Sequence, residues 1–292
     1  MSSQAERTSA GRGLDSAMGR IVTAVVVVVA LIVMMIGMGL FGGTRVALTV
    51  DGWLGEDATW LSPSGTAGYA WALVYAGFVG YALWQLMTPA PGLRHGRLRP
   101  WILGGIVLNI LWLLCVEAGM LLVSVALSIV QVAVLVVVLV LMERRRPASL
   151  GERLAVDCVQ SLYLGWMLVC VLVNINAGLA STGFSGGPLL PPTWAVIGIV
   201  ILTVVTAVLS AYSGGRLCMN LAVAWGLVWI GVGRIDGQGL QSGSVAVTAF
   251  GCAIVVMLAW AAAAWLSAKS PTGEARDLIA DALDGDGKIA TR

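Results

Sequence analysis

The chain contains 292 residues, of which 59% are hydrophobic and only 11% charged, and its mean hydropathy is +0.92. Soluble globular proteins usually carry about 25% charged residues, so this composition excludes an ordinary soluble domain and indicates a protein of the lipid bilayer. The formal net charge of +2 is too small to indicate a nucleic-acid-binding protein.

The first apolar run follows a positively charged N-terminal segment. This run covers residues 21–41, which is longer than the about 7–15 residues of a signal-peptide core, and no small-residue cleavage site closes it. We therefore interpret it as a retained first membrane span, and residues 1–20 as a cytoplasmic N-terminal segment.

The later apolar runs are also long enough to cross a bilayer, since a spanning helix needs about 20 mostly apolar residues. The weakest division lies at Ala118–Gly119, where only Glu117 interrupts the run 101–142, and a helical hairpin is expected there. Runs of this length satisfy their backbone in hydrocarbon as helices, so the sequence predicts an all-α membrane protein, a polytopic bundle of about eight transmembrane helices. The predicted spans are residues 21–41, 66–87, 101–118, 120–142, 156–179, 193–212, 217–233 and 245–268.

Basic residues cluster before the first span, in every second loop and after the last span. All of these segments lie on one side of the membrane if the chain crosses it eight times. The loops expected on the other side contain only Arg45 and Arg234, together with acidic residues. Because arginine and lysine are enriched in cytoplasmic loops, the pattern predicts a multi-pass integral protein, expected in a bacterial cytoplasmic membrane, with both termini cytoplasmic. The basic residues on the predicted inner side are Arg7, Arg12, Arg20, Arg94, Arg97, Arg99, Arg144, Arg145, Arg146, Arg153, Arg216, Lys269, Arg276, Lys288 and Arg292.

One face of the fifth predicted span carries hydrogen-bonding side chains. Tyr163, Trp166, Cys170 and Asn174 lie at helical spacing along it. An amide in contact with lipid would leave donors and acceptors unpaired, which costs up to several kcal/mol. Asn174 is therefore expected to face the interior of the bundle.

Three other spans carry similar side chains. Each amide alone is explained by hydrogen bonding between helices, and each aromatic alone by packing or by a position at the membrane interface. Their occurrence together favours a shared cavity, because intramembrane polar residues usually face a partner or a cavity. These side chains are Trp71, Tyr75 and Phe78 in the second span, Asn109, Trp112 and Glu117 in the third, and Gln131 in the fourth.

Three short motifs carry a family resemblance. "WALVY" contains Trp71 and Tyr75, "LNILW" contains Asn109 and Trp112, and "LYLGWMLVCVLVN" runs from Leu162 to Asn174. In order and spacing they resemble the W-x-x-x-Y, L-N-x-x-W and P-Y-x-x-W motifs of the tryptophan-rich sensory proteins, the TspO or translocator protein family, also known as peripheral benzodiazepine receptors. The resemblance covers residues 21–179 and implies a five-helix TspO-like unit.

The chain also departs from that family. Leu162 replaces the proline of the third motif, and "CVEAG" replaces a double-aromatic end of the third helix, so Glu117 is an addition. Residues 180–292 have no counterpart in the five-helix unit. They are expected to form three additional transmembrane helices (180–268) and a cytoplasmic polar tail (269–292).

The resemblance implies a ligand class. The family binds tetrapyrroles such as porphyrin and haem, as well as sterols and other flat hydrophobic molecules, and we expect such a ligand here in a cavity between helices, with no resident cofactor. Beyond the lipid bilayer no macromolecular partner is indicated, nucleic acid included, and a homodimer remains open. The expected ligand-binding residues are Trp71, Tyr75, Asn109, Trp112, Glu117, Gln131, Tyr163, Trp166 and Asn174.

Three kinds of function remain open at this stage. Sensing or handling of a bound ligand is expected first, because no catalytic set of Ser/His/Asp or Cys/His residues is present. A secondary transporter of a small hydrophobic metabolite would need coupling charges inside the membrane, and the spans carry few of them. A porphyrin-modifying membrane enzyme is implied only by the resemblance.

The histidine and the cysteines indicate no catalytic centre, no disulfide framework and no metal site. His95, the one histidine, is expected to be solvated in the loop after the second span, facing anionic headgroups. The five cysteines show no CxxC or CxxCH spacing, so the sequence indicates neither a disulfide framework nor a metal site.

The predicted topology can be tested with reporter fusions. A reporter at the C-terminus is expected on the cytoplasmic side, and a reporter inserted in the 42–65 loop on the opposite side, because the positive-inside rule fixes both. A C-terminal reporter found outside would show that the number of spans is wrong by one, most simply at Ala118–Gly119.

Overall fold

The computed structural model describes residues 17–87, 93–184 and 186–269. Within these ranges the protein is helical and contains no β-strand. Residues 1–16 of the predicted N-terminal segment and residues 270–292 of the predicted tail lie outside the described residues.

The described helices confirm the predicted polytopic bundle. Seven of them are long and apolar enough to cross a membrane, and α9 is a shorter apolar helix of 16 residues. The seven long helices are α2 (Ala17–Gly37), α3 (Tyr69–Met87), α4 (Leu93–Glu117), α5 (Leu121–Arg144), α7 (Val159–Ser181), α8 (Pro191–Tyr212) and α10 (Gly243–Lys269), and the shorter helix α9 covers Leu217–Val232. The short elements are η1 (Val46–Leu48), η2 (Val50–Gly52), η3 (Gly65–Gly68), α6 (Leu150–Glu152) and the π-helical turn η4 (Arg153–Cys158).

The weakest predicted boundary is confirmed. α4 ends at Glu117 and α5 begins at Leu121, with Gly119 between them at a φ of 74°. Glycine adopts this left-handed conformation without strain, and such a residue commonly ends a helix. The apolar run 101–142 therefore folds as a hairpin.

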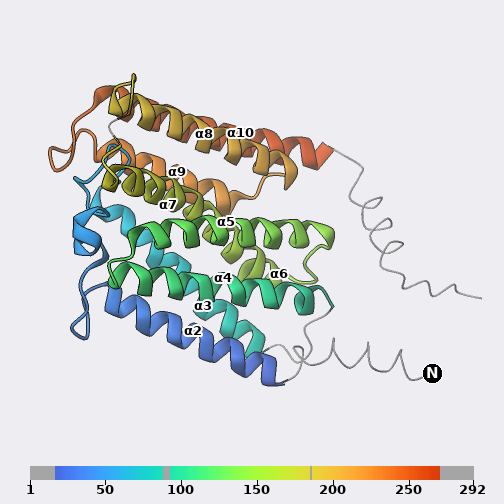
Figure 1. Cartoon of the computed structure of the whole chain (residues 1–292). Helices are drawn as coiled ribbons and strands as arrows, with labels where there is room; N and C mark the ends of the chain where they lie inside the picture. Colours follow the sequence, from blue (N-terminus) through green and yellow to red (C-terminus); the bar gives the residue numbers. More distant parts are fainter. Residues whose placement is uncertain (1–16, 88–92, 185, 270–292) are drawn as a thin grey trace, which may run out of the picture.

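Helix α7 lies at the centre of the bundle. It packs against α3, α5, α8 and α9 and is the most buried of the seven long spans. In Figure 1, α2, α3 and α4 lie on one side of α7, and α8 and α10 on the other. The helices that precede α7 in the chain and those that follow it thus share α7 as a common wall.

Close packing joins α7 to α9. A Cβ atom at Gly165 of α7 would overlap the backbone carbonyl of Met219, and one at Gly226 of α9 would lie 2.7 Å from the side chain of Val169. Small residues let helix backbones approach in membranes, where dispersion and not water exclusion drives helix association.

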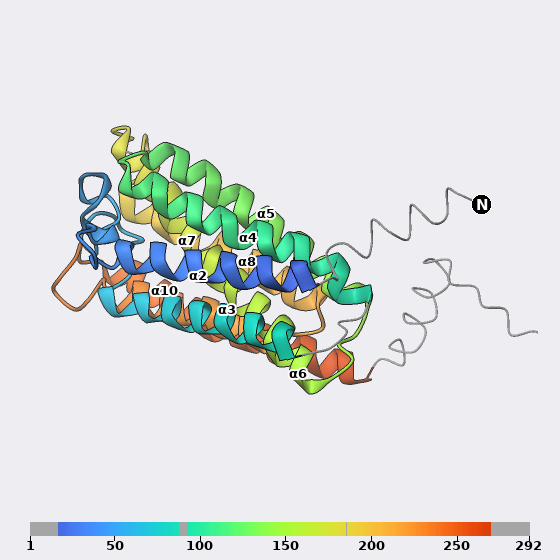
Figure 2. The same cartoon turned by 90° about the horizontal axis from the view of Figure 1, so that it is seen from below.

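The two ends of the bundle differ in chemistry. At one end, where α5 ends and α7 begins, charged side chains pair; we call this the ion-pair end. Arg94 contacts Glu152 at 2.7 Å and Asp157 at 2.5 Å, and Arg216 contacts Glu143 at 2.6 Å. At the other end, the loop end, residues 42–65 and 233–242 connect the helices (Figures 1 and 2).

The expectation that His95 is solvated is wrong. α4 begins at Leu93, eight residues before the predicted start of the third span at Trp101, so residues 94–99 form helical turns that face the bundle. His95 is only 1% exposed and lies 3.2 Å from the side-chain oxygen of Gln85, which also accepts a hydrogen bond from Arg99 Nε. Arg94 and Arg99 are also buried among polar partners, whereas Arg97 is exposed.

The expectation of no disulfide is also wrong. Cys158, at the start of α7, is bonded to Cys218, at the start of α9, across 60 residues of sequence. Sequence spacing gives no signal for this pair, because packing of α7 on α9 brings the two residues together. Cys115, Cys170 and Cys252 are free thiols.

The two described ends of the chain lie at the same end of the bundle. α2 begins and α10 ends at the ion-pair end of the bundle (Figure 1). This arrangement agrees with an even number of crossings, and the side of the membrane that this end faces stays a prediction.

The α7–α9 contact predicts a glycine-specific effect on stability. Gly165→Ala should lower the free energy of unfolding by about 1–3 kcal/mol, because the new methyl group meets a backbone carbonyl that cannot move aside. The measurement is the temperature at which half of the detergent-purified protein loses its monodisperse chromatographic peak.

The matched control is Gly104→Ala in α4, where an added Cβ meets no atom within 4 Å. This variant should be neutral or slightly stabilising, because alanine favours the helix. Equal stability of the two variants would contradict the close approach of α7 and α9.

Candidate ligand-binding cavity

A cavity of about 710 Å³ lies between α2, α3, α4 and α7 at the loop end. This volume is within the range of about 300–1,000 Å³ that is typical of small-molecule sites. Six of the nine side chains predicted from the sequence line it: Trp71, Tyr75, Asn109, Trp112, Trp166 and Asn174.

Three indole rings form the aromatic wall of the cavity. Trp71 of α3 is stacked with Trp112 of α4 at a centroid distance of 6.3 Å and an interplanar angle of 24°. Trp166 of α7 meets the same Trp71 ring edge-on at 6.1 Å. Rings from three helices therefore offer both faces and edges to a flat molecule, the geometries that aromatic groups prefer.

The polar groups of this wall are only partly used within the protein. The Tyr75 hydroxyl donates to Asn109 Oδ1 at 2.6 Å, which fixes the orientation of the amide. The indole nitrogens of Trp112 and Trp166 are buried and have no hydrogen-bond partner. Since buried N–H groups are normally paired, these two donors are unsatisfied within the protein.

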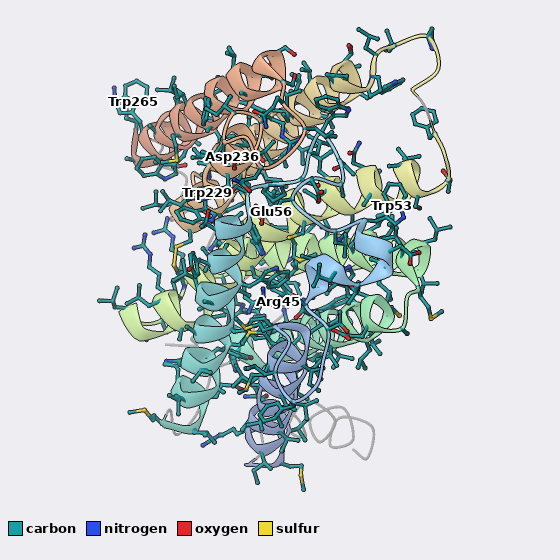
Figure 3. The ribbon with its side chains drawn as sticks, turned by 90° about the vertical axis from the view of Figure 1, so that its left-hand side faces the viewer. Arg45, Trp53, Glu56, Trp229, Asp236 and Trp265 are labelled. Atoms are coloured by element: carbon teal, nitrogen blue, oxygen red, sulfur yellow. A yellow bond between two sulfur atoms is a disulfide. The ribbon has the colours of Figure 1, made fainter. Side chains whose placement is uncertain are left out.

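The loop end supplies residues that the sequence did not place at the site. Residues 42–65, which we call the roof loop, contribute the charged side chains Arg45 and Glu56, and Figure 3 shows both from this end. Arg45 is exposed, and Glu56 Oε2 accepts a hydrogen bond from the Gly65 backbone at 2.7 Å. The sequence identified both as loop charges, but only the fold brings the loop over the cavity. The roof-loop residues in the lining are Arg45, Val46, Ala47, Leu54, Glu56, Pro63, Ser64 and Gly65.

Tyr163 and Gln131 are not brought to the cavity. The Tyr163 hydroxyl accepts a hydrogen bond from Gln131 Nε2 and donates to the Gly105 carbonyl at 3.2 Å. The Tyr163 ring packs edge-on against Phe78 at 5.0 Å. These contacts join α7 to α3, α4 and α5, so the two residues hold the helices that form the cavity.

Glu117 also lies off the cavity. It is half-buried at the last turn of α4, beside the hairpin to α5, and it is not part of the lining. Its position fits the polar residue that a hairpin turn needs.

No cluster of three or more His, Cys, Asp or Glu side chains suited to a metal ion occurs in the part of the chain that the structure describes. The chemistry of the cavity is therefore described by its aromatic rings, its amides and the two roof-loop charges.

Tyr163→Phe tests whether the Tyr163 hydroxyl stabilises the packing of the helices or contacts the ligand. Loss of the hydroxyl leaves the buried Gln131 amide without its partner, so the free energy of unfolding should fall by about 1–3 kcal/mol. Ligand affinity should stay within about twofold, because the ring still packs on Phe78. Both are measured on the detergent-purified protein, and a large loss of affinity without loss of stability would place the hydroxyl at the ligand.

Comparison with known proteins shows the family of the chain. No curated protein and no solved structure matches the chain. A family model described as TSPO-like protein matches residues 20–262, which includes the cavity helices, α8, α9 and most of α10. The last three helices thus lie within the region that the family model describes, and the chain belongs to the TSPO-like protein family.

Proposed function

We propose that this integral membrane protein binds a tetrapyrrole, or another flat hydrophobic molecule such as a sterol, in the cavity between α2, α3, α4 and α7. The observation that carries the proposal is the wall of three indole rings, with the amides Asn109 and Asn174, around a volume of about 710 Å³. Stacking on rigid aromatic rings with a few orienting polar groups is the usual composition of such a site.

The roof loop adds charge selectivity to this proposal. Arg45 is an exposed cation at the cavity, and it suits a ligand that carries carboxylate groups at its edge, as porphyrins do. Glu56 would disfavour a carboxylate on its own side. The charged edge of a bound porphyrin would therefore lie toward Arg45.

Sensing or handling of the bound molecule is the role that we favour. The only charged residues in the described lining are Arg45 and Glu56, both in the roof loop, so no described charge of the cavity lies at the depth where a coupled transporter needs one. Transport and porphyrin modification remain alternatives, and light- or oxygen-dependent spectral change of bound protoporphyrin would favour modification. We place the protein in a bacterial cytoplasmic membrane with both termini inside, on the charge pattern.

The proposal is tested by titrating the purified full-length protein in detergent with protoporphyrin and following tryptophan fluorescence. Trp166→Ala should raise the dissociation constant about two- to tenfold, because loss of a stacked ring removes about 0.5–1.5 kcal/mol beyond its buried area. Asn174→Ala, which removes a buried amide from the lining, should also weaken binding.

Two control variants lie away from the cavity. Trp265→Ala removes an indole of α10 that is 57% exposed, and it should leave the dissociation constant unchanged. Glu117→Gln should give the same titration as the unmodified protein from about pH 5 to 8, since the residue is not in the lining. Absence of saturable quenching in the unmodified protein, or an equal effect of all four variants, would refute the proposed site.

A further inference from the structure

The roof loop contacts the additional helices as well as the cavity. Residues 42–65 and the α9–α10 turn, residues 233–242, lie side by side at the loop end in both views (Figures 1 and 2). The inner surface of the roof loop lines the cavity, so whatever holds its outer surface determines how the cavity is closed.

One buried arginine of the α9–α10 turn binds the roof loop. Arg234 is 1% exposed, and its guanidinium donates to three backbone carbonyls of the loop. Nη1 donates to Thr59 at 2.9 Å, and Nη2 donates to Ser62 at 2.9 Å and to Glu56 at 3.2 Å. Glu56 thus binds Arg234 through its backbone carbonyl, and Glu56 is also one of the residues that line the cavity.

Two further hydrogen bonds from α9 hold the end of the loop and the start of η3. The Ser64 backbone N–H donates to the Trp229 carbonyl at 3.1 Å, and Trp225 Nε1 donates to the Ala67 carbonyl at 3.1 Å. Figure 3 shows Glu56 beside Trp229 and Asp236, on the side away from Arg45. The second half of the roof loop and η3, residues 56–67, are therefore held by α9 and the α9–α10 turn.

The charge of Arg234 makes this contact depend on the position of the loop. The carbonyls that it binds are neutral, and burial lowers the pKa of the guanidinium while the nearby Asp236 opposes that shift. If the roof loop moves away, three donors of a buried cation lose their partners together. A closed loop is thus the state in which this cation is solvated by the protein.

We infer that Arg234 is a positioning residue that holds the roof loop over the cavity, so that the α9–α10 turn of the additional helices controls access to a site to which those helices contribute no described lining residue. The first half of the inference concerns the loop alone, whereas the control of ligand entry rests on the proposed function. The two halves therefore need separate measurements.

Hydrogen exchange of the full-length protein in detergent, with no ligand added, tests the hold on the loop. In Arg234→Met, which keeps an unbranched apolar stem and removes the donors, amides of residues 56–65 should exchange at least about tenfold faster, because opening no longer breaks three charge-assisted bonds. Amides of α4 should be unchanged. Arg234→Lys, which keeps the charge and some of the donors, should fall between the two.

Gln238→Ala is the matched control in the same turn, because its side chain is exposed and no hydrogen bond of that side chain is present. It should exchange like the unmodified protein. Unchanged exchange of residues 56–65 in Arg234→Met, or the same acceleration in Gln238→Ala, would overturn the assignment of Arg234.

Stopped-flow mixing with protoporphyrin tests the control of entry. In Arg234→Met the association and dissociation rate constants should both rise at least about fivefold, with a smaller change in their ratio, because a loosened roof lowers the barrier in both directions. A merely structural role would lower thermal stability without this paired change in rates. Faster exchange of the loop with unchanged rate constants would overturn the control of entry.

Failure of the proposed function gives a different result from failure of this inference. If the unmodified protein does not bind protoporphyrin, the proposed function fails, while the exchange experiment still decides whether Arg234 holds the loop.

Discussion

The polar side chains of helix α7 lie where water cannot hydrate them, so they need partners in the protein. Much of the architecture follows from that constraint. Helix α7 is surrounded by α3, α5, α8 and α9 and is the most buried long span. In hydrocarbon or in a dry protein interior, an unpaired polar group costs several kcal/mol, so each one needs a partner in the protein or a place at a cavity. Tyr163 meets the first requirement through Gln131 and Gly105, and Asn174 meets the second.

The same constraint explains how much of the site could be predicted from the sequence. Helical spacing places Tyr163, Trp166 and Asn174 on one face, and the structure agrees that this face is buried. Spacing does not give the depth of the cavity along that face. Tyr163 and Asn174 are eleven residues apart, about 16 Å along the helix axis, so one stripe extends beyond the cavity, and Tyr163 at its far end serves packing instead.

Long-range pairing accounts for what the sequence did not reveal. The arginines and histidine of residues 94–99 suggested an exposed loop, because their buried partners, such as Gln85, Glu152 and Asp157, stand on other helices. The Cys158–Cys218 disulfide and the Arg234 contacts likewise join segments 60 or more residues apart. Hydropathy and charge patterns describe single helices, so they predict the spans well and such pairs poorly.

The segment from Arg216 to the α9–α10 turn contacts the part of the chain that precedes α8 at three places, and each contact uses a different interaction. At the ion-pair end, Asp157 contacts both Arg94 of α4 and Arg216 of α9, at 2.5 Å and 3.9 Å. One to two turns farther along α7, Gly165 lets the backbone of α9 approach at Met219. At the loop end, Arg234 binds the roof loop.

This distribution argues against a role for the additional helices as a lipid-facing appendage only. An appendage needs contact along one apolar face, where dispersion forces suffice. Here a buried cation and a shared carboxylate are used as well, and buried charges are costly unless they have polar partners. Pairs of this kind fix the register of α9 on α7. We infer that the position of α9 and the closure of the cavity are coupled through the roof loop, although the described lining of the cavity ends at Asn174, before α8 begins.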